Sequence, residues 1–141
     1  MRDVKDVEAE IDQDPYYSAL YEAESSRNPR AKNPDSTATG GFQLIAATAK
    51  ALGVEDPTDL EQSFDAVKRL TSQHDSEFGD DPVSRYAAHF LGATLLRKVV
   101  RGELLKPREQ EILDDFNQVA LPRFVRIYEK IAAKEQKQVT T

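Results

Sequence analysis

One glutamate at the end of an apolar helical stripe is the residue of this chain best suited to chemistry. Glu24 follows three apolar or aromatic residues at helical spacing, and all four share one helix face: Tyr17, Leu20, Tyr21 and Glu24. Partial removal of a carboxylate from water favours its protonated form, which suits general acid catalysis. The pattern therefore predicts a proton donor near the end of a helix over 15–26.

The residues after Glu24 predict a loop that could hold a ligand beside it. The stretch 28–41, NPRAKNPDSTATGG, is rich in proline, glycine and small polar residues, and Gln43 follows it. Two adjacent glycines allow close approach of the backbone to a ligand. An acid, a polar loop and a returning amide fit cleavage of a glycosidic bond, whose oxygen is protonated as it leaves. Arg27, Arg30 and Lys32 add a small basic cluster that could attract anionic groups of a substrate.

Helix signals account for most of the chain. Asp14-Pro15 and Asp81-Pro82 each join a capping aspartate to a proline at the first helical position. We expect helices over 3–11 and 15–26, a helix in FQLIAATAKALG that ends at Gly53, and a helix that ends at Phe78, before Gly79. The next is expected from 82 to Gly102, with a bend at Gly92. Another should run from Pro107 to a break at Leu121-Pro122, and a last amphipathic helix contains Phe124, Ile127, Tyr128 and Ile131. No segment has the two-residue period of a strand, so the predicted fold class is all-α.

Composition excludes several classes of protein. The chain has 141 residues, 39% hydrophobic and 31% charged, which is enough for one domain with a core. A net charge of −6 argues against nucleic-acid binding. We see no apolar run that could span a membrane and no signal-peptide pattern. With no cysteine and two histidines, we expect neither a metal site nor a cofactor.

Three segments, in order, resemble the soluble lytic transglycosylases. DPYYSALYEAESSRNP resembles the "DP…A…ES…NP" opening of that family, and STATGGFQLIAATAKALGV resembles its "GLMQLMPATAKELGV" segment. DLEQSF resembles its "DPEQNI" helix entry. The resemblance covers about Asp14 to Gly102. It implies a mainly helical, lysozyme-like fold in a single compact domain over 14–104, with a helical lead-in over 1–13 and a helical C-terminal extension over 105–141.

The resemblance also implies an activity. Members of the family cut the β-1,4 bond between N-acetylmuramic acid and N-acetylglucosamine in peptidoglycan without water and leave a 1,6-anhydromuramoyl end. By position, Glu24 takes the acid and base role, and no metal or cofactor takes part. The residues expected to support it or contact the glycan strand are Ser25, Ser36, Phe42, Gln43, Tyr86 and His89.

One segment departs from the family pattern. Where the family has "AYNAG", this chain has AHFLG, so His89 stands in place of the tyrosine, and Tyr86 lies three residues earlier on the same face. The variant resembles transglycosylases carried in bacteriophage virions or tails. It implies a virion protein that acts on the cell wall in the periplasm, with peptidoglycan strands and other virion or tail proteins as partners.

Two alternatives remain open at this point. A lysozyme-type hydrolase (muramidase) needs a second carboxylate, for which Asp35 is the nearest loop candidate. A non-catalytic peptidoglycan-binding virion module would keep the fold without turnover. The products of digestion separate the first alternative from a transglycosylase, and a Glu24→Gln variant separates the second.

Overall fold

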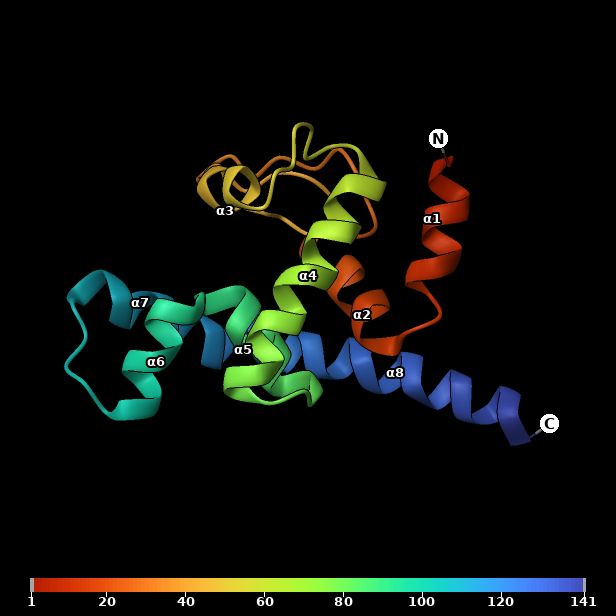
Figure 1. The fold of residues 1–141 in the computed structure, drawn as a ribbon. Helices are drawn as coiled ribbons and strands as arrows, with labels where there is room; N and C mark the ends of the chain where they lie inside the picture. Colours follow the sequence, from red (N-terminus) through yellow and green to blue (C-terminus); the bar gives the residue numbers. More distant parts are fainter. Residues whose placement is uncertain (1, 141) are drawn as a thin grey trace. The chain divides into compact units, whose positions relative to one another are not determined.

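Most of the chain is helical in the computed structural model, which describes residues 2–140, with side chains for residues 2–136. The elements are α1 (Val4–Ile11), α2 (Pro15–Ser25), α3 (Ala46–Ala51), α4 (Leu60–Phe78), α5 (Pro82–Leu91), α6 (Ala93–Arg101), α7 (Pro107–Asp115), the π-helical turn η1 (Phe116–Ala120) and α8 (Leu121–Thr140) (Figure 1). Within residues 2–140 no strand forms, and only isolated antiparallel bridges join Thr39 to Lys32 and to Leu44. The all-α prediction is confirmed.

The residues group into two compact units. The first comprises Met1–Leu70 and Ile127–Thr141, and the second comprises Thr71–Arg126. α4 contributes residues to both units, and so does α8. The division into a lead-in over 1–13, a domain over 14–104 and an extension over 105–141 stays a prediction. An amphipathic pattern shows that a helix packs on something, not which core it joins.

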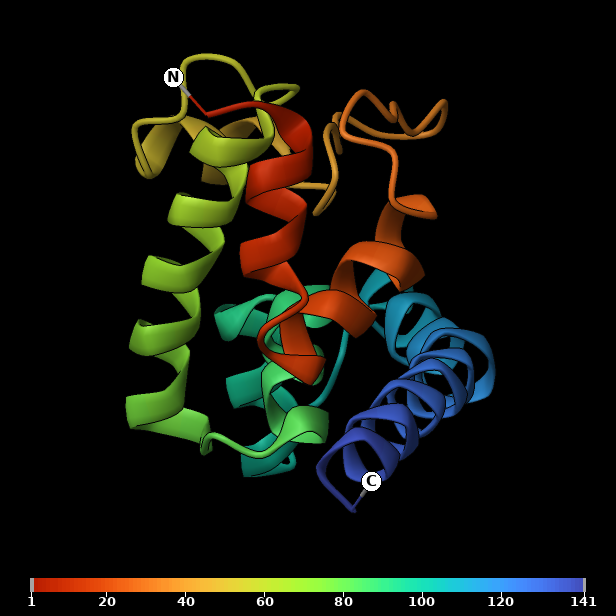
Figure 2. The ribbon, with the colours of Figure 1, turned by 90° about the vertical axis from the view of Figure 1, so that its right-hand side faces the viewer.

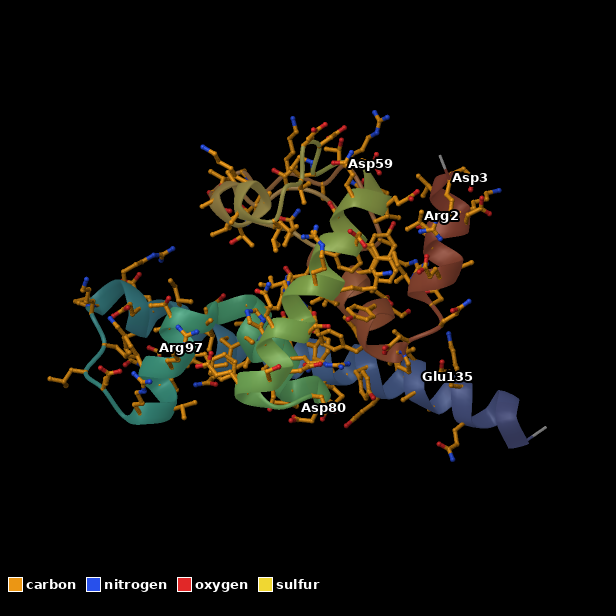
Figure 3. The ribbon with its side chains drawn as sticks, in the orientation of Figure 1. Arg2, Asp3, Asp59, Asp80, Arg97 and Glu135 are labelled. Atoms are coloured by element: carbon orange, nitrogen blue, oxygen red, sulfur yellow. The ribbon has the colours of Figure 1, made fainter. Side chains whose placement is uncertain are left out.

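In the first unit, the lead-in helix is part of the core. Val7 and Ile11 of α1 are buried, with 1% and 0% of their surface exposed. Figure 2 shows α1 beside the first turns of α4, and the Lys68 ammonium lies 3.2 Å from a Glu10 carboxylate oxygen. Arg2, labelled in Figure 3 at the start of α1, also pairs with Glu10. The segment before residue 14 is therefore a packed element of this unit.

The second unit is built around aromatic rings. Tyr86 of α5 stacks on Phe124 with ring centroids 4.2 Å apart and an angle of 7° between the planes. Phe116 of η1 lies 5.7 Å from Tyr86 and 5.4 Å from Phe90. Arg97, labelled in Figure 3 on α6, pairs with Glu77 at 2.8 Å. Contacts among these large rings join α5 to η1 and to the first turn of α8.

Two predicted boundaries differ from the structure near glycine and glutamine. The helix expected from Phe42 onward begins only at Ala46, because Gln43 has φ +54 and the Thr39–Leu44 bridge follows the course of a turn. At Gly92 the bend is a complete break: φ is +81, α5 ends at Leu91 and α6 begins at Ala93. Positive φ does not occur within a right-handed helix, so a regular helix cannot run through either residue.

The predicted break at Leu121-Pro122 was wrong. The helical backbone continues through η1, where the Leu121 N–H donates to the Phe116 carbonyl five residues earlier. Proline has no N–H to donate and its ring crowds the carbonyl four residues before it. A wider π turn leaves room for that ring, so the chain keeps its direction instead of breaking.

Candidate functional site

Glu24 lies in the last turn of α2 and is half-buried. The helix begins as the sequence predicts, because the Asp14 side chain accepts from the Tyr16 N–H at 2.9 Å and Pro15 occupies its first turn. Leu20 and Tyr21 are fully buried at 0% exposure. The apolar stripe thus anchors α2 in the first unit and leaves the carboxylate at the boundary between core and solvent.

The turn after Glu24 is clamped by Ser25. Its hydroxyl donates to the Tyr21 carbonyl at 3.0 Å and accepts from the Asn28 N–H at 3.1 Å. These bonds satisfy backbone groups that a helix end leaves without partners. In this structure the Ser25 hydroxyl shapes the turn that carries Glu24 and is engaged with backbone, rather than presented to a ligand.

The chain reverses through two left-handed residues, and neither of them is glycine. Ser26 has φ +54 and ψ +38, and Arg27 has φ +62. The Ser26 N–H donates to the Glu22 carbonyl at 2.9 Å, and the Arg27 N–H donates to the Tyr21 carbonyl at 3.3 Å. Glycine is the usual residue in such a helix end. A residue with a Cβ costs roughly 1–2 kcal/mol in this conformation, so other contacts must hold it.

Arg27 supplies those contacts. Its guanidinium makes a two-pronged pair with the Asp12 carboxylate at 2.9 and 3.0 Å and lies 4.9 Å from the centroid of the Tyr21 ring. The hydrogen bond that Arg27 donates to Asp12 raises the pKa of the guanidinium above its usual value, so it remains charged. Asp12 also accepts from the Ser18 hydroxyl of α2 at 2.9 Å. The Asp12 side chain, which precedes α2, therefore bonds both to Ser18 within the helix and to Arg27 after its end.

Tyr21 is the buried centre of the same arrangement. Its hydroxyl donates to a Glu8 carboxylate oxygen at 2.7 Å. Burial raises the pKa of the Tyr21 phenol above its usual value, and the bond to Glu8 adds to the shift. A Cβ on Gly41 would come within 2.7 Å of the Tyr21 ring, so only glycine fits there. The ring thus holds the loop over 28–45 against the helix that carries Glu24.

Gln43 closes that loop. Its side-chain amide donates to the Gly40 carbonyl at 2.9 Å and to the Ala31 carbonyl at 3.3 Å. The Gly40 N–H also donates to Ala31, at 2.8 Å. An amide group has two N–H donors, and both are used within the loop. The geometry gives Gln43 the task of shaping the loop, where the sequence analysis expected a contact with substrate.

Two other residues of the first unit, Phe42 and Ser36, are also predicted to contact substrate. Phe42 is a core residue with 0% exposed surface, and its ring packs 5.5 Å from Tyr21 and 5.8 Å from Phe64. A contact of Phe42 with substrate stays a prediction that this burial does not support. Ser36 is exposed, and its hydroxyl accepts from the Ala38 N–H at 3.1 Å. Asp35 is also exposed, and its backbone N–H donates to the Asn33 side chain at 2.8 Å.

The remaining predicted residues, Tyr86 and His89, belong to the second unit, whereas Glu24 belongs to the first. Tyr86 has 0% exposed surface among the rings of its unit, so its predicted contact with glycan has no support from its burial. Phe124 covers its ring face, which a sequence pattern within α5 could not reveal. His89 is half-buried in the last turn of α5.

Sequence reasoning missed the residues that hold the end of α2. Arg27 was grouped with Arg30 and Lys32 as a basic cluster for substrate, but its charge is directed to Asp12. Arg27 and Asp12 are fifteen positions apart, on either side of α2, and no helical spacing relates them. The only local signal was the absence of glycine after ESS, where a helix end usually has one.

The described residues offer no site for a metal ion: no group of three or more His, Asp or Glu side chains among them has the arrangement to hold one. None of the helices in the described chain is long and apolar enough to cross a membrane. Comparison of the chain with protein-family models, with curated proteins and with solved structures gives no match.

Proposed function

We propose that the chain is a peptidoglycan lytic transglycosylase of lysozyme-like fold in which Glu24 is the catalytic acid and base. The observation that carries the proposal is the half-buried Glu24 carboxylate at the end of a buried helix, on a turn fixed by Ser25 and beside a loop closed by Gln43. The motifs that resemble the family supply these three residues in the same order. The helical composition is consistent with the proposed fold.

The proposed reaction uses one carboxyl group twice. The Glu24 carboxyl first donates its proton to the glycosidic oxygen as the bond from that oxygen to the muramic acid C1 breaks. Its carboxylate then takes the proton of the same sugar's 6-hydroxyl, and that oxygen bonds to C1. The sugar's acetamido oxygen can stabilise the positive charge at C1 between the two steps, as in other substrate-assisted glycosidases. No water is consumed, and Glu24 ends protonated as it began.

The structure favours this reaction over hydrolysis that uses Asp35. Asp35 is exposed, and the Asn33 side chain accepts from its N–H, which is the geometry of an Asx turn. A second catalytic carboxylate needs to face the scissile bond opposite the acid. We therefore give the Asp35 carboxylate no part in the proposed reaction. A setting consistent with the resemblance is a virion protein that opens the cell wall during infection.

The test compares Glu24→Gln with Asp35→Asn on purified peptidoglycan. Glutamine keeps the shape of the side chain but cannot exchange a proton, so turnover should fall by at least ~10²–10⁴-fold, the usual contribution of general acid and base catalysis. Asp35→Asn should retain most activity. Mass spectrometry should find 1,6-anhydro ends, which are one water lighter than hydrolysed ends.

Two results would contradict the proposal. Muramic acid with a free reducing end as the main product, together with an inactive Asp35→Asn variant, would establish a hydrolase. Binding to peptidoglycan without release of fragments by the wild-type protein would establish a binding module. Circular dichroism of each variant checks that the helices are intact.

A further inference from the structure

The chain reversal directly after Glu24 needs support from outside its own backbone. Ser26 and Arg27 both have positive φ, at +54 and +62, and both carry a Cβ. Their local hydrogen bonds go to carbonyls of the last turn of α2, so any relaxation of the reversal also moves that turn. Glu24 lies in this turn. What holds Arg27 in place therefore also helps to hold the turn that carries Glu24.

Three contacts hold Arg27, and each reaches a different part of the first unit. The guanidinium pairs with both oxygens of Asp12, which lies before α2. It also lies over the Tyr21 ring, which is fully buried within α2. Its backbone N–H donates to the Tyr21 carbonyl at 3.3 Å. A planar guanidinium can make the paired bond and the ring contact together, whereas an ammonium group cannot.

We propose that Arg27, through its pair with Asp12 and its contact with Tyr21, is a positioning residue that orients the Glu24 carboxylate. The inference rests on the proposed function of Glu24 and goes beyond it, because it names the group that fixes the geometry of the acid. The side chains of Arg27 and Asp12 are 33% and 44% exposed, so their contribution to overall stability is small. Their effect on catalysis should be much larger than their effect on folding.

The experiment uses Arg27→Lys, Arg27→Met, Asp12→Asn and the Asp12→Asn/Arg27→Met double variant. Misplacement of a catalytic group by about 1 Å can cost ~10²-fold in rate, so kcat on solubilised glycan strands should fall roughly 10- to 100-fold with KM nearly unchanged. The melting temperature should fall by about 4 °C or less, as for an exposed ion pair. Because Arg27 and Asp12 act as one unit, the double variant should lose no more than the worse single variant.

A second exposed pair in the same unit provides the matched control. Arg69 lies 3.4 Å from Asp65 on α4, with side-chain exposures of 51% and 65%. Arg69→Lys and Asp65→Asn should leave kcat unchanged. Loss of kcat in these variants equal to that in the Arg27 series would show a general effect of charge and overturn the proposal. A raised KM with unchanged kcat in Arg27→Met would also overturn it, since that is the signature of a residue that binds substrate.

An NMR titration of the Glu24 side-chain carboxyl separates this inference from the proposed function. The carboxyl resonance and its apparent pKa should change in Arg27→Lys and Asp12→Asn and stay as in the wild type in the Arg69 and Asp65 variants. This readout does not depend on activity, so it holds even if Glu24→Gln shows that the chain is no transglycosylase. An unchanged Glu24 titration in all the Arg27 and Asp12 variants would overturn the positioning role.

Discussion

Residues that combine a conformational demand with a specific contact define the region around Glu24. Ser26 and Arg27 adopt left-handed conformations without being glycine, while Gly40 and Gly41 are positions that only glycine fits. Hydrogen bonds and a salt bridge stabilise Ser26 and Arg27 in their conformations. Gly40 and Gly41 lack a side chain, which lets neighbouring atoms approach the backbone closely. Both devices bring the loop over 28–45 to the end of α2, which is where the proposed acid stands.

Gly40 offers a test of how tightly the loop is packed. It has φ +90, and a Cβ there would lie 2.1 Å from the Pro57 carbonyl oxygen. Gly40→Ala should destabilise the protein by roughly 3 kcal/mol or more, since strain and a backbone clash act together. Gly53 is the control, because it has φ +75 but no atom within 4 Å of the added Cβ. Gly53→Ala should cost only about 1 kcal/mol, the strain alone.

Urea denaturation of both variants measures the difference in free energy of unfolding. Equal values for Gly40→Ala and Gly53→Ala would mean that the Pro57 contact does not constrain the loop. Turnover on peptidoglycan can be followed in the same samples, because the proposed function requires a correctly placed loop.

At the scale of elements, the same local signal starts two helices. Asp14-Pro15 begins α2, and Asp81-Pro82 begins α5. Asp14 accepts from the Tyr16 N–H, and Asp81 accepts from the Ser84 N–H at 3.0 Å. Aspartate satisfies a free N–H of the first turn, and proline occupies a position where no N–H is needed. This chemistry is local, which is why sequence reasoning located both starts.

The cap of α5 can be tested against its own neighbour. Asp81→Ala should cost about 1 kcal/mol of stability, because the Ser84 N–H loses its acceptor. Asp80, labelled in Figure 3, is exposed and precedes the cap, so Asp80→Ala should change stability by less than ~0.5 kcal/mol. Thermal melts of the two variants measure the loss of stability that each substitution causes. An Asp80→Ala change as large as that of Asp81→Ala would indicate a general effect of negative charge near the helix start.

The π-helical turn shows how an element is adjusted rather than broken. Proline at position 122 removes one donor, yet α7, η1 and α8 follow one another without a loop. η1 brings Phe116 into the same aromatic cluster as Phe124. Burial of two such rings outweighs the poorer hydrogen bonds of a five-residue π turn.

At the scale of the whole molecule, the stability of the chain should depend on pH near neutrality through His74. Its side chain is buried at 9% exposure on α4, beside the Phe78 ring. Burial lowers the pKa of His74 below 6.5, the charge of His89 and, more weakly, that of Arg97 lower it further, and Asp75 and Glu77 oppose the shift. The folded state thus binds the proton more weakly than the unfolded state does. Stability is therefore full above about pH 6.5 and is lost as pH falls through the depressed pKa.

Melting temperatures between pH 7.5 and pH 5 test this prediction. The wild-type value should fall across that range, and His74→Leu should remove most of the fall because the titrating group is gone. His89→Gln should retain a reduced fall, since burial of His74 remains its main cause. An unchanged pH dependence in His74→Leu would assign the effect to the carboxylates instead.

The sequence by itself determined the features whose causes are local. Helical periodicity gave the all-α class, and aspartate-proline pairs and glycines located helix ends at Pro15, Phe78 and Pro82. The candidate acid, Glu24, was also found locally, as a carboxylate at the end of an apolar stripe. Its role and those proposed for its neighbours stay predictions.

Only the tertiary structure decided which residues belong together. Nothing local pairs Arg27 with Asp12 or Lys68 with Glu10, and nothing within GGFQL says that Phe42 faces the core while the Gln43 amide closes its own loop. The division into two units, and the membership of α8 in both, likewise depend on which apolar faces meet. The physical reason is that capping and periodicity act over one or two helical turns, whereas packing and ion pairing join residues at any separation along the chain.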